Sequence, residues 1–296
     1  MKPAPFTYHR PVTRDEVDAL LAALGGDAKL LAGGQSLIPI LNMRLAAPGH
    51  VIDLNHLGDE PSEPWLDGGH VCVGPIVRQS ATERSDLVAE RVPLLAETLD
   101  FVAHPAIRNR GTVAGSIAHA DPAAELPSVL AVLGGHVVAR SSAGRRTIRA
   151  GDCFAGPLEN SLDDTEWVEE VRWPTAEPNQ GFAFAEFARR SGDYALCGVA
   201  ARAERASDGT TMIALGYLGM GDVPVCIDLA PLETSALEGA ELEDAIRQLV
   251  EDRLDPVDDI HATVAFRRHL ARKLGVNAAR RAWTRASTSH AQGAAR

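Results

Sequence analysis

Hydrophobic positions in the N-terminal half alternate between a helical and a strand-like period. Thr13-Arg-Asp-Glu16 fits a capping box, and the apolar residues after it repeat at the spacing of one helix face until Gly25-Gly26. A second helix is expected from Gln35 or Ser36 to Leu45. Strands are predicted by short apolar runs at residues 29–32, 50–53 and 70–73. Because helices and strands alternate, this half is predicted to be mixed α and β.

The apolar pattern changes in the C-terminal half. Helical or strand-like runs occur at residues 125–133, 136–140, 147–150 and 167–173. Turn-forming residues then cluster between Pro174 and Gly181, and they predict a boundary between domains at residues 1–176 and 177–284. Beyond it, two helices follow an antiparallel sheet whose strands are predicted at residues 182–187, 197–206 and 211–218. Residues 285–296 have no apolar period, so a disordered tail is expected.

Length and charge narrow the class of protein. A chain of 296 residues with 45% hydrophobic content can fill two packed domains. Its formal net charge of −11 argues against nucleic acid or an anionic membrane surface as the main partner. The segment from Met1 to Phe6 lacks the apolar core of a signal peptide, and no stretch approaches the roughly 20 apolar residues of a membrane span. We therefore expect a soluble, cytoplasmic protein with no membrane span.

The four cysteines give no metal-binding pattern. Cys72, Cys153, Cys197 and Cys226 are far apart, and none forms a C-x-x-C pair. Each is flanked by apolar or small residues, so buried, reduced thiols are expected. An iron–sulfur cluster normally requires four thiolates in a recognisable set, and this chain offers none. No metal ligands are predicted in this chain.

Two segments rich in small residues are candidates for binding a diphosphate. The first loop, Ala32-Gly-Gly-Gln-Ser36, lies between a predicted strand and a predicted helix, where backbone N–H groups can approach an anion. The second segment, from Arg108 to Glu125, combines glycines, hydroxyl residues, a histidine and two carboxylates, and it is too irregular for one helix or strand. Neither segment is a P-loop or a G-x-G-x-x-G fingerprint. Taken alone, each is better explained as a structural turn.

These segments occur together with two further motifs, Ile107-Arg-Asn-Arg-Gly-Thr112 and Arg190-Ser-Gly-Asp-Tyr-Ala-Leu-Cys-Gly-Val199. In order and separation they resemble the FAD-binding medium subunits of molybdenum hydroxylases, the group of carbon monoxide, xanthine, caffeine and nicotine dehydrogenases. The resemblance extends over essentially the whole chain, and it identifies residues 112–116 as the second loop. It implies an α+β fold, in which an FAD-binding domain of the vanillyl-alcohol-oxidase/molybdenum hydroxylase type, with two α/β subdomains, precedes a smaller C-terminal domain of an antiparallel sheet and helices.

The resemblance also implies which residues bind FAD. Backbone N–H groups of the two loops and the Ser36 hydroxyl would hold the phosphates. Asp121 and Glu125 would accept hydrogen bonds from cofactor hydroxyls near the ribose and adenine, and Tyr194 would cover one face of the isoalloxazine. No residue is expected to be catalytic. The complete set of implied cofactor-binding residues is Leu31, Ala32, Gly33, Gly34, Gln35, Ser36, Leu37, Thr112, Val113, Ala114, Gly115, Ser116, His119, Asp121, Glu125 and Tyr194.

Two positions depart from related patterns. Ala114 stands where many family members have glycine, so its methyl group must fit at that point of the second loop. Gln35 occupies the position at which flavoprotein oxidases of the broader superfamily often attach the cofactor through a histidine. The resemblance therefore implies that FAD is bound non-covalently.

Four of the implied binding residues also fit purely structural roles, and the sequence does not decide between the two. Asp121 precedes Pro122 and fits an Asx turn that caps the next helix. Glu125 fits the first turn of a helix, where a carboxylate interacts favourably with the helix dipole. Tyr194 fits a half-buried aromatic residue of a sheet, and His119 fits a histidine that bonds to the backbone.

In this interpretation the chain is the flavin subunit of a three-component enzyme. A large subunit would hold the molybdopterin centre and a small subunit two [2Fe–2S] clusters, and the expected assembly is a dimer of heterotrimers. Electrons from hydroxylation at molybdenum would pass through the clusters to FAD and then to an external acceptor. The alternative is a stand-alone FAD-dependent oxidase or dehydrogenase acting on a small organic substrate, although the part after Gln180 is small for a substrate domain. The sequence identifies neither the hydroxylated substrate nor the acceptor.

Overall fold

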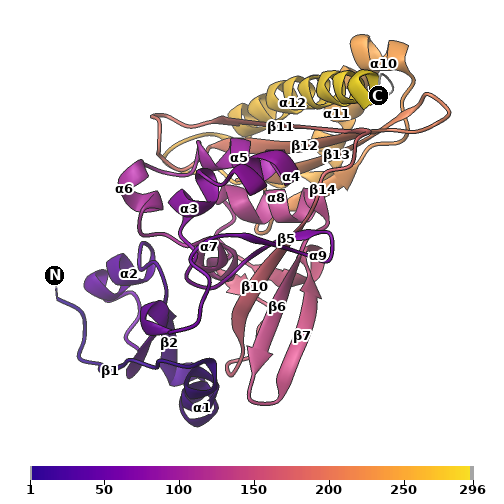
Figure 1. The fold of residues 1–296 in the computed structure, drawn as a ribbon. Coiled ribbons are helices and arrows are strands. Elements are labelled where there is room, and N and C mark those ends of the chain that lie inside the picture. The colour runs from indigo at the N-terminus through magenta and orange to yellow at the C-terminus, as the bar shows by residue number, and fades with distance from the viewer. Residues whose placement is uncertain (1, 294–296) are drawn as a thin grey trace.

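A computed structural model of the chain describes residues 2–293 and divides them into three consecutive parts, each built on a sheet (Figure 1). The N-terminal part has a three-stranded parallel sheet of order β1-β3-β2. Its elements are β1 (Thr7–His9), α1 (Arg14–Leu24), η1 (Gly25–Asp27), β2 (Ala28–Leu31), α2 (Leu37–Met43), β3 (His50–Asp53) and η2 (Leu54–His56), where η denotes a 3-10 helix.

Only half of the predicted capping box forms at the start of α1. The Thr13 hydroxyl accepts a hydrogen bond from the Glu16 N–H at 3.2 Å, as expected of an N-cap. The Glu16 carboxylate accepts from the Val12 N–H at 2.7 Å instead of returning to Thr13. The helix nevertheless begins and ends where the apolar period predicts.

The second part contains a five-stranded antiparallel sheet of order β4-β5-β10-β6-β7, a two-stranded hairpin and several short helices. Strand β5 and helix α8 have the predicted bounds, whereas the short helices before α8 are not apparent in the apolar pattern. The elements are β4 (Trp65–Asp67), β5 (His70–Val73), α3 (Gln79–Glu83), α4 (Asp86–Arg91), α5 (Pro93–Leu99), α6 (Pro105–Arg108), α7 (Val113–His119), α8 (Glu125–Leu133), β6 (His136–Ser141), β7 (Gly144–Arg149), α9 (Ala150–Cys153), β8 (Phe154–Gly156), β9 (Glu159–Asn160) and β10 (Trp167–Pro174).

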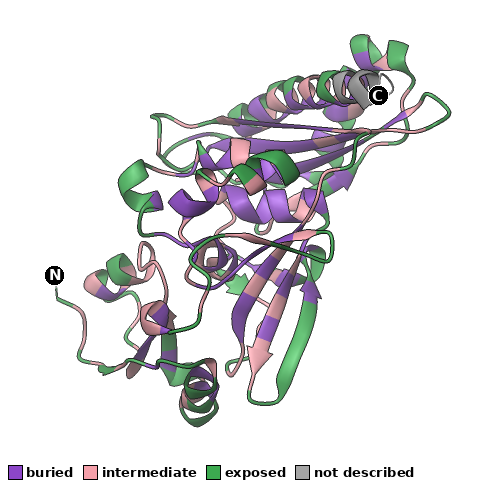
Figure 2. Cartoon of the chain, viewed as in Figure 1, coloured by how far each residue is buried: buried purple, intermediate pink, exposed green. Residues whose placement is uncertain are grey.

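The third part is a four-stranded antiparallel sheet between two layers of helices (Figure 1). Helix α12 covers one face, and α5 and α8 of the second part cover the other, so the second and third parts share one hydrophobic core. Figure 2 shows this buried layer, in contrast to the largely exposed strand β7 at the far edge. The elements are β11 (Gln180–Phe187), β12 (Cys197–Arg205), β13 (Thr211–Leu218), β14 (Val225–Asp228), α10 (Thr234–Glu238), α11 (Ala240–Arg253) and α12 (Val264–Gly293).

Two sequence-based expectations are wrong. The expected disordered tail from residue 285 is helical as far as Gly293, and Ala286 is fully buried. The helix backbone lies against Gly181 of β11, where a Cβ atom would overlap the backbone at Ala286. This face is built from alanines, which give no strong apolar period; residues 294–296 lie outside the described residues. Cys226 is exposed rather than buried, because on the edge strand β14 it lies on the face opposite to the buried residue Ile227.

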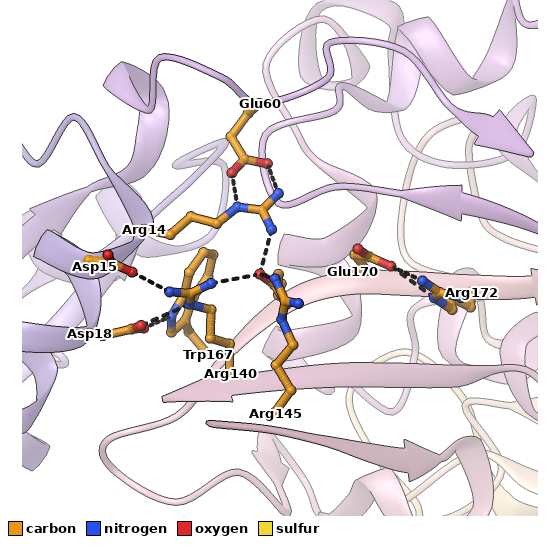
Figure 3. A network of polar contacts seen from close by, with 10 residues as sticks. Arg14, Asp15, Asp18, Glu60, Arg140, Arg145, Trp167, Glu170 and Arg172 are labelled. Carbon is orange, nitrogen blue, oxygen red and sulfur yellow. Dashed lines mark hydrogen bonds and ion pairs between the residues drawn. The ribbon is translucent and has the colours of Figure 1, made fainter. Parts of the chain in front are cut away.

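A cluster of charged side chains joins α1 to the five-stranded sheet (Figure 3). Glu169 on β10 has a fully buried side chain, 0% exposed, at its centre. The carboxylate lies within ion-pair distance of three guanidinium groups, those of Arg14 (2.5 Å), Arg140 (3.3 Å) and Arg145 (2.5 Å). Burial opposes ionisation of this carboxyl, but the arginines outweigh it and lower the pKa of Glu169. The set, called the Glu169 cluster below, also contains Asp15, Asp18, Glu60 and Trp167.

Candidate functional site

A cavity of about 680 Å³ lies where the three parts meet. The N-terminal part contributes the first loop and α2, the second part contributes the second loop with α7 and the start of α8, and the third part contributes residues 192–194. A volume of this size is typical of sites for cofactors and other small molecules. Every predicted site residue lines the cavity except Leu31 and Val113, and Val113 is buried in the core.

The first loop presents a row of backbone donors without acceptors. Among the described residues, the N–H groups from Gly33 to Leu37 donate no hydrogen bond to the protein. Gly34 has a φ of +72°, a conformation that glycine adopts without strain. Ser36 is the N-cap residue of α2, yet its hydroxyl makes no capping bond, and the Gln35 side-chain amide donates to the Gly33 carbonyl at 3.0 Å. The loop thus lines the cavity and has five consecutive N–H groups, 33–37, and one hydroxyl available for a ligand.

The second loop packs directly against the first. A Cβ atom at Gly33 would lie 2.6 Å from both the Arg110 carbonyl oxygen and the Gly111 Cα atom, so the two backbones are in contact. Thr112 is the N-cap of α7, and its hydroxyl accepts from the Gly115 N–H at 3.0 Å. Ala114 is 3% exposed and its methyl group packs in the core, which explains how an alanine fits at this position.

Two carboxyl groups and a tyrosine lie close together at the cavity wall. Asp121 forms the Asx turn, because its Oδ1 accepts from the Ala123 N–H at 2.9 Å. Glu125 begins α8 and is 9% exposed, and burial, aided by the nearby charge of Asp121, raises the pKa of its carboxyl to about 7. Partial desolvation of the Tyr194 hydroxyl, followed by the charges of the two carboxylates, raises the pKa of Tyr194.

Tyr194 is not a half-buried sheet residue. Its side chain belongs to the loop between β11 and β12, and the residue is 70% exposed while lining the cavity. In this loop Gly192 has a φ of +83° and packs against the His104 ring, where a Cβ atom would overlap the Cε1 atom of His104. The Tyr194 ring therefore lies at the cavity and is not part of the hydrophobic core.

Gln79 lines the cavity but is missing from the sequence-based set of site residues. It is the first residue of α3, 5% exposed, and its Oε1 has no hydrogen-bond partner among the described residues. A buried amide oxygen without a partner is unusual. This atom lies against Gly111, where an added Cβ atom would be 2.6 Å from it. No sequence signal reveals Gln79, because Arg78-Gln-Ser-Ala81 resembles any helix start. His119 also lines the cavity, at the end of α7.

The described part of the chain shows no candidate metal site. No three His, Cys, Asp or Glu side chains within residues 2–293 converge in a way that could hold a metal ion. Over the same residues, no helix combines the length and the apolar character needed to cross a membrane.

Comparisons with known proteins agree with this geometry. Residues 4–176 match the model described as the FAD binding domain in molybdopterin dehydrogenase, and residues 182–282 match the CO dehydrogenase flavoprotein C-terminal domain. The chain is 38% identical to the nicotine 6-hydroxylase medium subunit of Paenarthrobacter nicotinovorans, over 93% of this chain and 96% of that one. It is 31% identical to the carbon monoxide dehydrogenase medium chain of Hydrogenophaga pseudoflava, over 96% of this chain and 99% of that one.

A solved structure extends the similarity to the fold. Quinoline 2-oxidoreductase from Pseudomonas putida 86 superposes with a TM-score of 0.86 at 32% identity, over 98% of this chain and 100% of that chain. These matches define the class as a flavoprotein component of an oxidoreductase. More specifically, the chain belongs to the family of FAD-binding medium subunits of molybdenum hydroxylases.

Proposed function

We propose that this chain binds FAD non-covalently in the cavity, takes electrons from [2Fe–2S] clusters of a small partner subunit and passes them to an external acceptor. A large partner subunit would hold the molybdopterin centre, and the assembly would be a cytoplasmic dimer of heterotrimers. The names of the relatives, which are medium subunits and chains, support this division of labour, as does coverage of nearly their full length.

The observation that carries the proposal is the convergence of the two loops on one cavity. Among the described residues, the N–H groups of residues 33–37 lack protein acceptors and lie beside the second loop. In the second loop the N–H groups of Val113, Gly115 and Ser116 are already bonded within the protein, so the free donors come mainly from the first loop. Such a row of donors suits the diphosphate of FAD, because each phosphate oxygen can accept from backbone donors without a neighbouring side chain. The Ser36 hydroxyl would add one more donor.

The remaining wall residues suit the rest of the cofactor. Asp121 and Glu125 would bind cofactor hydroxyls, and Glu125 can both donate and accept near neutral pH because burial raises its pKa to about 7. Gln79 would add one more polar side chain to this wall. Tyr194 would lie against the isoalloxazine, where an exposed ring gains contact area.

When bound, FAD supplies the redox chemistry, and the residues of this chain bind and orient it. None of the residues lining the cavity is required as a general acid or base for hydroxylation, since that reaction would occur on the large subunit. The side chain of Gln35 is turned back onto its own loop, which supports non-covalent binding at this position.

The test is the flavin content of the purified full-length chain. We expect flavin absorption bands, and acid precipitation should release all of the flavin into the supernatant as FAD. Flavin retained in the pellet would contradict non-covalent binding, and a colourless chain that takes up no added FAD would contradict the proposal as a whole.

Electron transfer is tested by reconstitution. The chain alone should show at most weak diaphorase activity, and efficient substrate oxidation should require the large and small subunits. Efficient oxidation of a small organic substrate by the single chain would support a stand-alone dehydrogenase instead.

A further inference from the structure

Arg78 connects the two loops of the cavity from behind. It lies between β5 and α3, and its guanidinium donates from Nη1 to the Arg110 carbonyl oxygen, just before the second loop, at 2.5 Å. From Nη2 it donates to the Asn55 Oδ1 atom, also at 2.5 Å. Neither Arg78 nor Asn55 lines the cavity. Arg78 can therefore act on a bound cofactor only through the residues that it holds.

Asn55 continues the connection to the first loop. Its Nδ2 donates to the Ala32 carbonyl oxygen at 2.8 Å and to Asp53 Oδ1 at 2.5 Å. Asp53 is held in turn by the Tyr8 hydroxyl, which donates to Oδ2 at 2.6 Å. One chain of hydrogen bonds thus runs from Ala32 through Asn55 and Arg78 to Arg110, joining loops that belong to different parts of the fold.

The chemistry of this position requires a guanidinium. A planar fork can reach two acceptors in fixed directions at once, whereas the ammonium group of lysine is a point donor on a flexible stem. Desolvation, followed by the nearby charge of Arg110, lowers the pKa of Arg78, so the site is unfavourable for a cation unless the hydrogen bonds offset its burial. The Arg110 carbonyl oxygen and the Asn55 Oδ1 atom must therefore stay in position to offset the cost of burying this cation.

We propose that Arg78 is a positioning residue that fixes the separation of the two loops, so that the cofactor site is formed before the cofactor binds. The proposal rests on the proposed function, because it assumes that FAD contacts both loops. Without this connection, the loops would separate more readily in the empty protein, and binding would have to bring them back together. Preorganisation of this kind raises affinity by removing an ordering step.

The experiment measures the dissociation constant of FAD for the full-length chain after removal of flavin, by fluorescence titration. Arg78→Met, which keeps the length of the side chain but removes both donors, should weaken FAD binding by about tenfold to a hundredfold, the range expected for charge-assisted hydrogen bonds. Arg78→Lys should recover part of this loss. The matched control is Arg84→Met, since Arg84 is an exposed arginine at the C-cap of the same helix and should stay within about twofold of wild type.

Two further readouts separate positioning from general stability. Visible circular dichroism of the bound flavin should change in Arg78→Met and not in Arg84→Met, and amide exchange of residues 32–37 should be faster in the flavin-free Arg78→Met protein. If Arg78→Met does not fold, Arg78→Lys and Asn55→Ala carry the same test, and both should weaken FAD binding.

An unchanged dissociation constant in Arg78→Met, or in both substitute variants, would overturn the inference even if the melting temperature falls. Failure of the wild-type chain to bind FAD would instead overturn the proposed function, so the two results are distinguishable.

Discussion

The N-terminal part meets the second part in two regions that differ in how their polar groups are satisfied. In the Glu169 cluster, a fully buried carboxylate is surrounded by three arginines, and Asp18 accepts from both Arg140 and the Trp167 indole. At the cavity, by contrast, five consecutive backbone N–H groups, 33–37, lack protein acceptors, and a buried oxygen of Gln79 has no partner among the described residues. In the first region the chain itself pairs the charged groups, whereas in the second region the backbone N–H groups have no partner in the described part of the chain.

This difference separates structural from ligand-binding polar groups. Buried polar groups are normally hydrogen-bonded, because an unsatisfied one is strongly unfavourable. In the Glu169 cluster, Oε1 accepts hydrogen bonds from the arginines, and Oε2, which makes no hydrogen bond, is compensated by its ion pair with Arg145 at 2.5 Å. At the cavity, the N–H groups of residues 33–37 are partly exposed, so their acceptors come from water or from a ligand and not from residues 2–293 of the chain. Substitutions in the first region should therefore affect stability, and substitutions in the second should affect flavin binding.

The largest effect is expected from Glu169→Gln. The change leaves three arginines without their shared carboxylate and should lower the free energy of unfolding by about 3–5 kcal/mol. Because the folded-state pKa of Glu169 is lowered, its contribution is present above the usual glutamate pKa and is lost as the pH falls through the folded value. Urea unfolding of the flavin-free chain measures it.

If the two regions are independent, Glu169→Gln should leave the FAD affinity of the folded protein nearly unchanged. Asp244→Asn, which removes an exposed ion pair with Arg247, is the control and should have no measurable effect. A large loss of FAD affinity at full folding would show that the two regions are not separate.

Gly33→Val, unlike Glu169→Gln, should act mainly on FAD binding. A side chain here would collide with the backbone at Arg110 and Gly111, so the loops could not keep their contact. FAD binding should weaken by at least about a hundredfold, equivalent to roughly 2.7 kcal/mol. The measurement is flavin content after purification, followed by titration. Gly151→Val is the control, because a Cβ there meets no atom within 4 Å, and full flavin occupancy in Gly33→Val would contradict the site.

The sequence predicts the loops better than it predicts what holds them. Small residues mark residues 32–36 and the segment from Arg108 to Glu125 as candidates, and the family resemblance, not the composition, selects residues 112–116 as the second loop. The resemblance of the motif around Tyr194 places that residue at the same site. Arg78 and Gln79 give no signal, because their roles depend on Asn55 and on the cavity, which only the folded chain brings to them.

The same distinction applies to the fold. Strands at residues 50–53 and 70–73 and the helix at 125–133 follow from local apolar patterns, and the structure has them at those bounds. The Glu169 cluster could not be predicted, since Arg14 and Glu169 are 155 residues apart and the chain has many other arginines and acids to pair. The buried face of α12 likewise could not be predicted, because its alanines give no strong hydrophobic periodicity.

A smaller effect, dependent on pH, is expected from Glu186→Gln. Glu186 lies on β11, next to the buried residues Phe184 and Ala185, and one of its oxygens has no partner among the described residues. Burial, followed by the charge of Glu125, raises the pKa of Glu186 from 4.5 to about 8. The stabilising contribution of the protonated acid is thus complete below the unfolded pKa and is lost as the pH rises through the folded value.

Glutamine stays neutral, so the variant should become progressively more stable than wild type between about pH 5 and 8. Melting temperatures of the flavin-free proteins across this range measure the difference. Asp244→Asn should show no such widening, and a constant difference between Glu186→Gln and wild type would show that Glu186 is already ionised at pH 5.

The smallest effect on stability is expected from Tyr194→Ala. An exposed side chain in a loop contributes little to the core, so the melting temperature of the flavin-free protein should stay nearly unchanged. If the ring lies against the isoalloxazine, its loss should weaken FAD binding by about 0.5–1.5 kcal/mol and shift the flavin absorption spectrum and reoxidation rate. Tyr194→Phe keeps the ring and should retain most of the affinity, which separates the ring from the hydroxyl.

The matched control is Tyr217→Ala, because Tyr217 is fully buried in β13 while Tyr194 is 70% exposed. Truncating the buried ring should destabilise the flavin-free protein by about 3–5 kcal/mol. The two tyrosines therefore compare a residue of the hydrophobic core with a residue of the proposed cofactor site. If Tyr194→Ala lowered stability as Tyr217→Ala does and left the flavin spectrum unchanged, Tyr194 would belong to the core, and its place in the cofactor site would be wrong.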